Sequence, residues 1–136
     1  MKKWLVDREH MAECAKDLLQ VDARVWTFTG TLGTGKTTLV QEMLDQLGIE
    51  GPIQSPTYTY VSVYQDSRGK TVYHFDLYRL SSYNEFIQAG FDEYLYDENA
   101  LCFIEWPEIL EKQLPAKTTQ VTLAYTSDGK RLITAQ

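Results

Sequence analysis

Cysteine is scarce in this sequence, and long apolar segments are absent from it. Cys14 and Cys102 are the two cysteines among 136 residues, and they form no Cys-x-x-Cys pair. Their spacing gives no indication of a zinc site, so we expect both side chains to be buried thiols. No apolar run is long enough to span a membrane, and acidic residues interrupt the N-terminal segment, which argues against a signal peptide. We therefore expect a cytoplasmic protein that does not associate with a membrane.

Basic residues are also in the minority. The 13 Lys and Arg residues are outnumbered by 19 Asp and Glu residues, which gives a net charge of −6, and the arginines are scattered along the chain. Binding to nucleic-acid phosphates needs clustered basic side chains. We therefore expect this chain to act on a nucleic acid only indirectly, through a partner protein.

Segments with helical and strand patterns alternate along the chain. The predicted helices cover residues 8–20, 36–47, 82–96 with a break at Gly90, and 108–114, and the predicted strands cover 23–29, 57–65, 70–78, 100–106, 119–126 and 131–135. Turn residues at 66–69 and 127–130 predict two antiparallel hairpins. This order predicts one α/β domain over residues 1–136, with a mixed sheet and helices on both of its faces.

The segment Gly30–Thr37 has the pattern Gly-x-x-x-x-Gly-Lys-Thr between a predicted strand and a predicted helix. Glycines let backbone N–H groups point at phosphate oxygens, and the helix N-terminus adds positive potential. Lys36 would bring its charge to the outer phosphates, and Thr37 would give a hydroxyl to Mg²⁺. A chance match in a chain of this length occurs on the order of once in two hundred, which disfavours a turn that only caps a helix. The segment predicts a P-loop NTPase-like fold that binds a magnesium–nucleotide.

Two acidic residues stand at the ends of predicted buried strands. Asp76 follows Val-Tyr-His-Phe, and Glu105 follows Leu-Cys-Phe-Ile. An acid in that position is costly unless a cation or hydrogen bonds compensate it, and a P-loop enzyme needs such an acid for the magnesium shell and the attacking water. Either acid could instead cap a neighbouring helix. The residues alone leave the metal role open between Asp76 and Glu105.

Four segments of the chain resemble the TsaE family, once called YjeE. Its members are small bacterial ATPases that take part in making threonylcarbamoyladenosine in tRNA. The matching segments are 30–38, 55–59 (Ser-Pro-Thr-Tyr-Thr), 73–80 (Tyr-His-Phe-Asp-Leu-Tyr-Arg-Leu) and 104–108 (Ile-Glu-Trp-Pro-Glu), in the family's order and spacing. Many families share the first segment, whereas the last two are far more specific.

The resemblance implies a role for each matching residue. Glu105 matches the family's second magnesium residue beside Thr37, which decides between the two acids. Asp76 matches the acid near the γ-phosphate and its water, and Thr57 matches the threonine of the first switch; with Lys36 these are the implied catalytic residues. The implied nucleotide-binding residues are Gly30, Leu32, Gly33, Thr34, Gly35, Lys36, Thr37 and Thr38. The implied cofactors are ATP and Mg²⁺, and the implied partners are TsaD, the threonylcarbamoyl transferase, and TsaB.

The chain departs from the family at Thr31, where Asp is usual, and at Thr34, where Ala is usual. Neither is a fixed position of the loop pattern, so nucleotide binding is expected to survive. Adenine contacts in the family come partly from the N-terminal segment and the C-terminal hairpin. The corresponding candidates here are Arg8, Glu9 and either Lys130 or Arg131.

Two further residues in the 73–80 segment have competing interpretations. His74 is interpreted as a packed, hydrogen-bonded histidine that orders the loop carrying Asp76, rather than as a catalytic base. Arg79 is interpreted as the partner of a local acid or of another protein, rather than as an internal arginine finger. Trp106 is expected to pack beside the site, next to Glu105.

An ATPase that drives the cycle of a partner complex is the favoured function. A small-molecule kinase would need an acceptor pocket and a lid with arginines, and no such segment is evident. A nucleotide-gated assembly module that does not hydrolyse ATP is a third possibility. A GTPase is disfavoured, because the sequence has no Asn-Lys-x-Asp motif.

Overall fold

The computed structural model describes residues 1–7, 9–49 and 60–136. Its strands are β1 (Lys2–Val6), β2 (Val25–Thr29), β3 (Val61–Gln65), β4 (Thr71–Asp76), β5 (Leu101–Glu105), β6 (Thr118–Tyr125) and β7 (Arg131–Ala135). Its helices are α1 (Ala12–Leu19), α2 (Lys36–Gln46), α3 (Tyr83–Gln88), α4 (Phe91–Leu95) and the 3₁₀ helix η1 (Pro107–Leu110). Strands and helices alternate as the sequence predicts.

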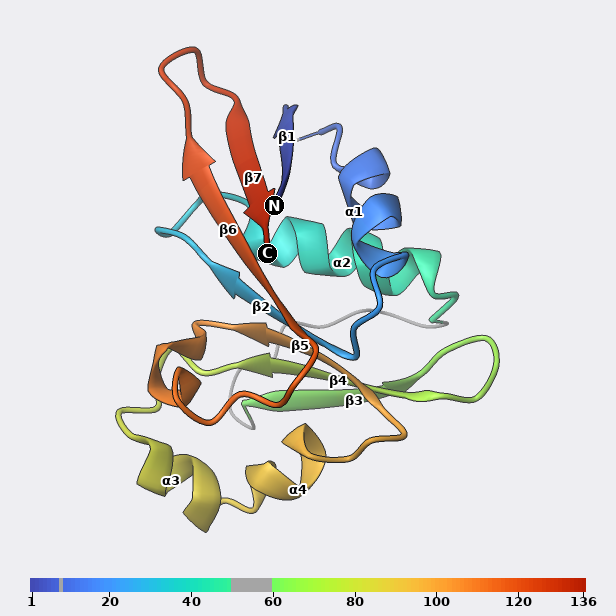
Figure 1. The fold of residues 1–136 in the computed structure, drawn as a ribbon, viewed down its shortest axis with the longest axis vertical. Coiled ribbons are helices and arrows are strands. Elements are labelled where there is room, and N and C mark those ends of the chain that lie inside the picture. The colour runs from blue at the N-terminus through green and yellow to red at the C-terminus, as the bar shows by residue number, and fades with distance from the viewer. Residues whose placement is uncertain (8, 50–59) are drawn as a thin grey trace.

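The strands form one mixed sheet in the order β1-β7-β6-β2-β5-β4-β3 (Figure 1). The four central strands, β6, β2, β5 and β4, are parallel to one another. The outer strands β7, β1 and β3 pair antiparallel, which confirms the two predicted hairpins. Because the central strands are parallel, the carboxyl ends of β2, β5 and β4 meet at one edge of the sheet, where α/β proteins bind ligands.

Helices cover both faces of the sheet, as expected, and each face has its own apolar core. Side chains alternate along each strand, so Trp26 and Phe103 face α1 and α2, whereas Phe75 and Ile104 face the other side. Figure 1 shows α1 and α2 on one side of the sheet and α3 and α4 on the other. The face covered by α2 is the one that carries the candidate site.

Several element boundaries differ from the sequence prediction. Strand β1 was not predicted; it pairs with β7, and its Trp4 indole donates a hydrogen bond to Asp17 of α1. The first helix starts at Ala12 instead of residue 8. The helix expected at 108–114 is a short 3₁₀ helix that starts at Pro107, and the break at Gly90 is confirmed by its φ of 80°.

The two cysteines are buried and free, as expected. Burial raises the pKa of both thiols to about 12, with help from nearby Asp17 at Cys14. Over the described ranges, 1–7, 9–49 and 60–136, no helix is long and apolar enough to cross a membrane.

Candidate functional site

The loop between β2 and α2 needs its glycines for two different reasons. Gly33 and Gly35 have φ of 82° and 100°, in the left-handed region that disfavours residues with a side chain. Gly30 instead lies against β6, where an added Cβ would come within 2.6 Å of the Leu123 carbonyl oxygen. The loop therefore has a tight, curved backbone that starts α2 directly at Lys36.

Lys36 is 95% buried at the base of this loop, with 5% of its surface exposed. Its ammonium donates hydrogen bonds to the carbonyls of Gly30 and Thr31, the latter over 3.1 Å. The same ammonium lies 4.0 Å from the ring centroid of Trp106, which has a left-handed backbone with φ of 57°. Burial lowers the pKa of Lys36, and the nearby acids, Glu105 first, only partly oppose this shift. The lysine is thus fixed with its charge at the pocket.

Glu105 links the helix to the neighbouring strand. Its Oε1 accepts a 2.7 Å hydrogen bond from the Thr37 hydroxyl, and its Oε2 lies 2.6 Å from Nε2 of His74. Glu105 and His74 are 2% and 0% exposed, and Nδ1 of His74 has no hydrogen-bond partner among the residues that the structure describes. Since a buried N–H without an acceptor is costly, the favoured tautomer carries its hydrogen on Nε2 and donates it to Glu105. Both carboxylate oxygens are therefore held in place.

The hydroxyl of Thr37 and the carboxylate of Glu105 fit a magnesium site. With bonds of about 2.0–2.1 Å, neighbouring ligands of an octahedral Mg²⁺ lie about 2.9 Å apart, close to the 2.7 Å between these two oxygens. Residues 1–7, 9–49 and 60–136 contain no group of three or more His, Cys, Asp or Glu that could hold a metal. This donor set suits an ion that takes its other ligands from water and phosphate.

Asp76 stands next to Glu105, because the two residues are paired in the parallel register of β4 and β5. Its Oδ1 accepts a 3.2 Å hydrogen bond from the backbone N–H of Tyr78. Burial raises the pKa of Asp76, and the negative charge of Glu105 raises it further. The hydrogen bond from Tyr78 lowers this pKa, and so do the charges of His74 and Lys36, but burial dominates. Asp76 is only partly buried, so its other oxygen can meet a ligand or water.

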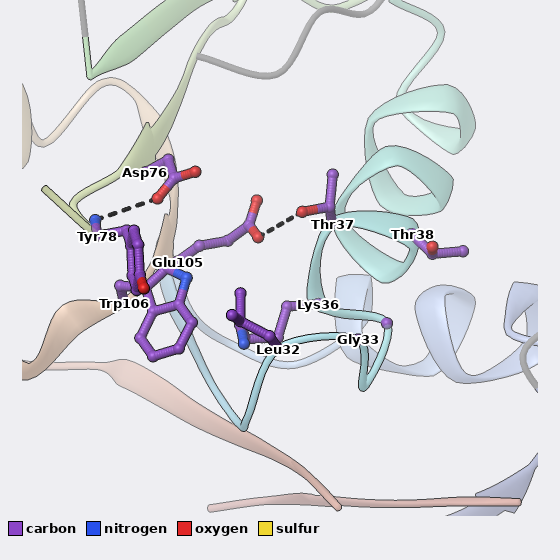
Figure 2. Close-up of a pocket in the computed structure, with 10 residues that line it drawn as sticks. Leu32, Gly33, Lys36, Thr37, Thr38, Asp76, Tyr78, Glu105 and Trp106 are labelled. Atoms are coloured by element: carbon purple, nitrogen blue, oxygen red, sulfur yellow. Dashed lines mark hydrogen bonds between the residues drawn. The ribbon is translucent and has the colours of Figure 1, made fainter. Parts of the chain in front are cut away.

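These groups surround one open pocket of about 250 Å³ (Figure 2). Figure 2 shows Glu105 and Thr37 pointing toward each other across it, with Asp76 on the same side as Glu105. The lining residues are Leu32, Gly33, Gly35, Lys36, Thr37, Thr38, Asp76, Tyr78, Glu105 and Trp106. All of these except Tyr78 are predicted from the sequence as site residues or their neighbours; Tyr78 is predicted only as the last residue of the strand 70–78.

The other predicted site residues lie near this pocket or outside the residues that the structure describes. Gly30 lies behind it and offers its carbonyl to Lys36. Thr34 is 1% exposed and donates a 2.8 Å hydrogen bond to the Thr31 carbonyl, so its side chain supports the loop. Thr57, predicted as the first-switch residue, and Arg8 lie outside the described residues.

The structure also shows the contacts of three residues that were interpreted from the sequence, His74, Arg79 and Arg131. His74 is packed and hydrogen-bonded, as expected, and its hydrogen bond goes to Glu105 on the neighbouring strand. Arg79 is exposed and forms no ion pair with any acid in the described part of the chain, which argues against a local partner. Arg131, a candidate for adenine, donates to the carbonyls of Gly33 and Thr34.

The fold and site together define an α/β protein in which a glycine-rich strand-to-helix loop faces carboxylates from two adjacent parallel strands. The family model described as "Threonylcarbamoyl adenosine biosynthesis protein TsaE" matches residues 5–133. The chain belongs to the TsaE family, which takes part in tRNA threonylcarbamoyladenosine biosynthesis.

Individual relatives agree with this assignment. The chain is 41% identical over 103 residues to the tRNA threonylcarbamoyladenosine biosynthesis protein TsaE of Haemophilus influenzae, covering 76% of this chain and 64% of that protein. It is 38% identical over 113 residues to the protein of the same name from Treponema pallidum, covering 83% and 82%. The crystal structure of Bacillus subtilis YdiB superposes with a TM-score of 0.73 and 31% identity, covering 98% of this chain and 83% of YdiB.

Proposed function

We propose that this chain is an ATPase that binds Mg–ATP at the Gly30–Thr37 loop. Hydrolysis drives or resets a partner complex that makes threonylcarbamoyladenosine in tRNA. The partners are TsaD and TsaB, by resemblance to the family, and tRNA is reached only through them. The acidic net charge of −6 supports this division of labour, because a chain of that charge is poorly suited to hold tRNA itself.

One observation carries the proposal. The hydrogen bond between Thr37 and Glu105 and the buried Lys36 lie around a single pocket at the carboxyl ends of β2 and β5. A lysine at the start of a helix, together with a hydroxyl and a carboxylate in contact, is the constellation that P-loop NTPases use for a nucleotide phosphate and Mg²⁺. A glycine-rich turn that only capped a helix would not need a buried carboxylate facing it.

Each residue then has a distinct role. The backbone N–H groups of the loop and the ammonium of Lys36 hold the outer phosphates. Thr37 and Glu105 hold the metal ion; when bound, Mg²⁺ neutralises charge that develops on the phosphate oxygens. Asp76, on the strand next to Glu105, orients the attacking water by accepting its hydrogen bond.

Hydrolysis by the isolated chain is expected to be slow. Lys36 is the one cationic side chain among the described residues that line the pocket. An additional arginine at the γ-phosphate is worth about 10³- to 10⁵-fold in such sites. The missing charge, or an equivalent ordering of the switch segments, would come from a partner.

Calorimetry with ATP and magnesium tests the binding step, with Lys36→Ala as the variant and Lys70→Ala, an exposed lysine, as the matched control. Lys36→Ala should lose tight binding and Lys70→Ala should keep it. Hydrolysis is then measured alone and with TsaD and TsaB. Near-normal ATP affinity in Lys36→Ala would exclude the phosphate site, whereas phosphate transfer to an added acceptor would identify a kinase instead.

A further inference from the structure

The C-terminal hairpin, β6 and β7, lies beside the glycine-rich loop, because β6 is the neighbour of β2 in the sheet. The hydroxyl of Tyr125, the last residue of β6, donates a hydrogen bond to the carbonyl of Gly33. Arg131, the first residue of β7, donates to the same carbonyl through Nη2 over 3.3 Å and to the carbonyl of Thr34 through Nε over 3.4 Å. Three donors from the hairpin therefore converge on two consecutive carbonyls of the loop.

The two donor side chains also support each other. The guanidinium carbon of Arg131 lies 4.5 Å from the ring centroid of Tyr125, which places the cation over the ring. Nη1 of Arg131 donates a 2.9 Å hydrogen bond to the carbonyl of Gly129 in the hairpin turn. The two residues also face each other in the register of β6 and β7. The pair is therefore a preformed element of the hairpin.

Peptide planarity transmits this contact to the inside of the loop. In a trans peptide the N–H of the next residue points opposite to the carbonyl. The Gly33 carbonyl and the N–H of Thr34 belong to one peptide plane, so holding the carbonyl fixes the direction of this N–H, which donates a 3.3 Å hydrogen bond to the Thr31 carbonyl. The Thr34 carbonyl and the N–H of Gly35 share the next peptide plane, so the contact of Arg131 with this carbonyl directs the N–H of Gly35 away from Arg131. Because Gly33 and Gly35 lack the restraint of a side chain, these peptides need an external anchor.

We propose that Tyr125 and Arg131 are positioning residues that set the loop's affinity for phosphate groups by anchoring the carbonyls of Gly33 and Thr34. The inference rests on the proposed function, since it assumes that phosphates bind at this loop. It differs from the sequence interpretation of Arg131 as an adenine contact. A base contact would affect ligands that carry adenine, whereas a loop anchor affects every ligand that carries the phosphates.

A ligand without a base separates these two roles. Inorganic tripolyphosphate carries the phosphate chain and no adenine, so its affinity with magnesium should depend on the anchor alone. Tyr125→Phe removes one hydroxyl and keeps the ring under Arg131. Arg131→Lys keeps the charge and loses the forked donor. We expect each variant to weaken ATP and tripolyphosphate by the same factor, about three- to tenfold, the range for one lost hydrogen bond.

Matched controls come from the opposite side of the sheet. The Tyr96 hydroxyl donates to the carbonyl of Gln113, and Arg24 donates to the carbonyl of Leu95 over 2.9 Å. Tyr96→Phe and Arg24→Lys therefore remove contacts of the same kind away from the loop. They should leave both affinities unchanged, even where they lower the melting temperature. Backbone amide NMR of the free protein adds a direct readout: Tyr125→Phe should shift the Thr34 and Gly35 signals more than Tyr96→Phe does.

The outcomes are distinct. Tripolyphosphate affinity that stays at the wild-type value in Tyr125→Phe and Arg131→Lys overturns the inference while the ATP site stands. Loss of ATP affinity with unchanged tripolyphosphate affinity also overturns it, in favour of a base contact. A wild-type protein that binds neither ligand overturns the proposed function, and this inference with it. Parallel loss for both ligands, with the amide shifts, supports it.

Discussion

The Thr37 hydroxyl donates a 2.7 Å hydrogen bond to Oε1 of Glu105, although the two residues are 68 positions apart in the chain. Thr37 is the second residue of helix α2, and Glu105 is the last residue of strand β5. Neither oxygen needs to move far to share a metal ion. Because His74 holds the second carboxylate oxygen, the Glu105 side chain is already oriented before any ligand binds.

Glu105→Gln should therefore weaken nucleotide binding that depends on magnesium. The amide can still accept a hydrogen bond from Thr37, so the loop should stay in place, but the negative charge for the metal is gone. We expect at least about a tenfold loss of affinity with magnesium, in line with the effect of disturbing a metal site. Calorimetry with ATP in magnesium and in EDTA measures the difference, and binding without magnesium should change little.

Asp76→Asn should show the opposite pattern. Asp76 lies beside Glu105 but does not contact Thr37 in the described structure, so its assigned role is at the water. We expect near-normal ATP affinity with magnesium and hydrolysis slowed by about 10²-fold or more, the typical effect of losing a positioned proton acceptor. Single-turnover hydrolysis measures this. If the two variants exchange their phenotypes, the acids have the reverse roles.

His74 gives a test of the orientation of Glu105. The amide nitrogen of Gln can replace Nε2 of His, whereas the shorter Asn places its nitrogen near the position of Nδ1. His74→Gln should therefore keep most of the magnesium-dependent ATP affinity. His74→Asn should lower this affinity by about 10- to 100-fold, the usual effect of removing a residue that orients a metal ligand. Circular dichroism and melting curves check that both variants fold. Equal affinities in the two folded variants would mean that His74 serves packing alone.

The pKa of Asp76 predicts a stability effect in the free protein. Burial raises this pKa above its ordinary value, so the folded state binds the proton more readily than the unfolded state. Stability then falls as pH rises from the unfolded pKa through the folded pKa, and it stays reduced at neutral pH. Asp76→Asn should raise the ligand-free melting temperature by a few degrees at pH 7. The gain should shrink as the pH falls below the ordinary pKa of a carboxyl group.

Differential scanning fluorimetry across pH measures this effect, with the exposed Glu98→Gln as the control for a removed acid. The control should show little change at any pH. A melting temperature of Asp76→Asn that falls at pH 7 would mean that the carboxylate stabilises the free fold. In that case burial would not be the dominant influence on Asp76.

The loop and both acids could be predicted because each depends on local sequence. The glycine spacing defines the loop between Gly30 and Thr37, and an acid after an apolar run marks the end of a buried strand at Asp76 and Glu105. Strand β1 could not be predicted in the same way. It is an edge strand with little burial, and its partner β7 lies at the opposite end of the chain.

The contacts between side chains on different strands could not be predicted from the sequence either. The contact of His74 with Glu105 depends on the register of β4 and β5, and no pattern within either strand encodes that register. The same holds for Tyr125 and Gly33, which are 92 positions apart. Trp106, just before the 3₁₀ helix at Pro107, has a left-handed backbone, whereas a residue before proline is expected to be extended, so propensities do not predict this conformation.

The last prediction concerns the source of a positive charge at the γ-phosphate in addition to that of Lys36. Lys36 is already shared between two loop carbonyls and the Trp106 ring, and no arginine lines the pocket among the described residues. Arg79, three residues after Asp76, is exposed and has no acidic partner in the described part of the chain, so it is available to another protein.

We therefore expect slow steady-state hydrolysis by the chain alone and a large increase with TsaD and TsaB. Arg79→Ala should leave the slow basal rate within about twofold, because a surface side chain contributes little on its own, and should reduce the stimulated rate. Arg68→Ala, an exposed arginine in the β3–β4 turn, is the matched control and should change neither rate. Fast hydrolysis by the isolated chain that collapses in Arg79→Ala would mean that the arginine finger is internal. An arginine finger is worth about 10³- to 10⁵-fold, so the two outcomes are far enough apart for one assay to separate them.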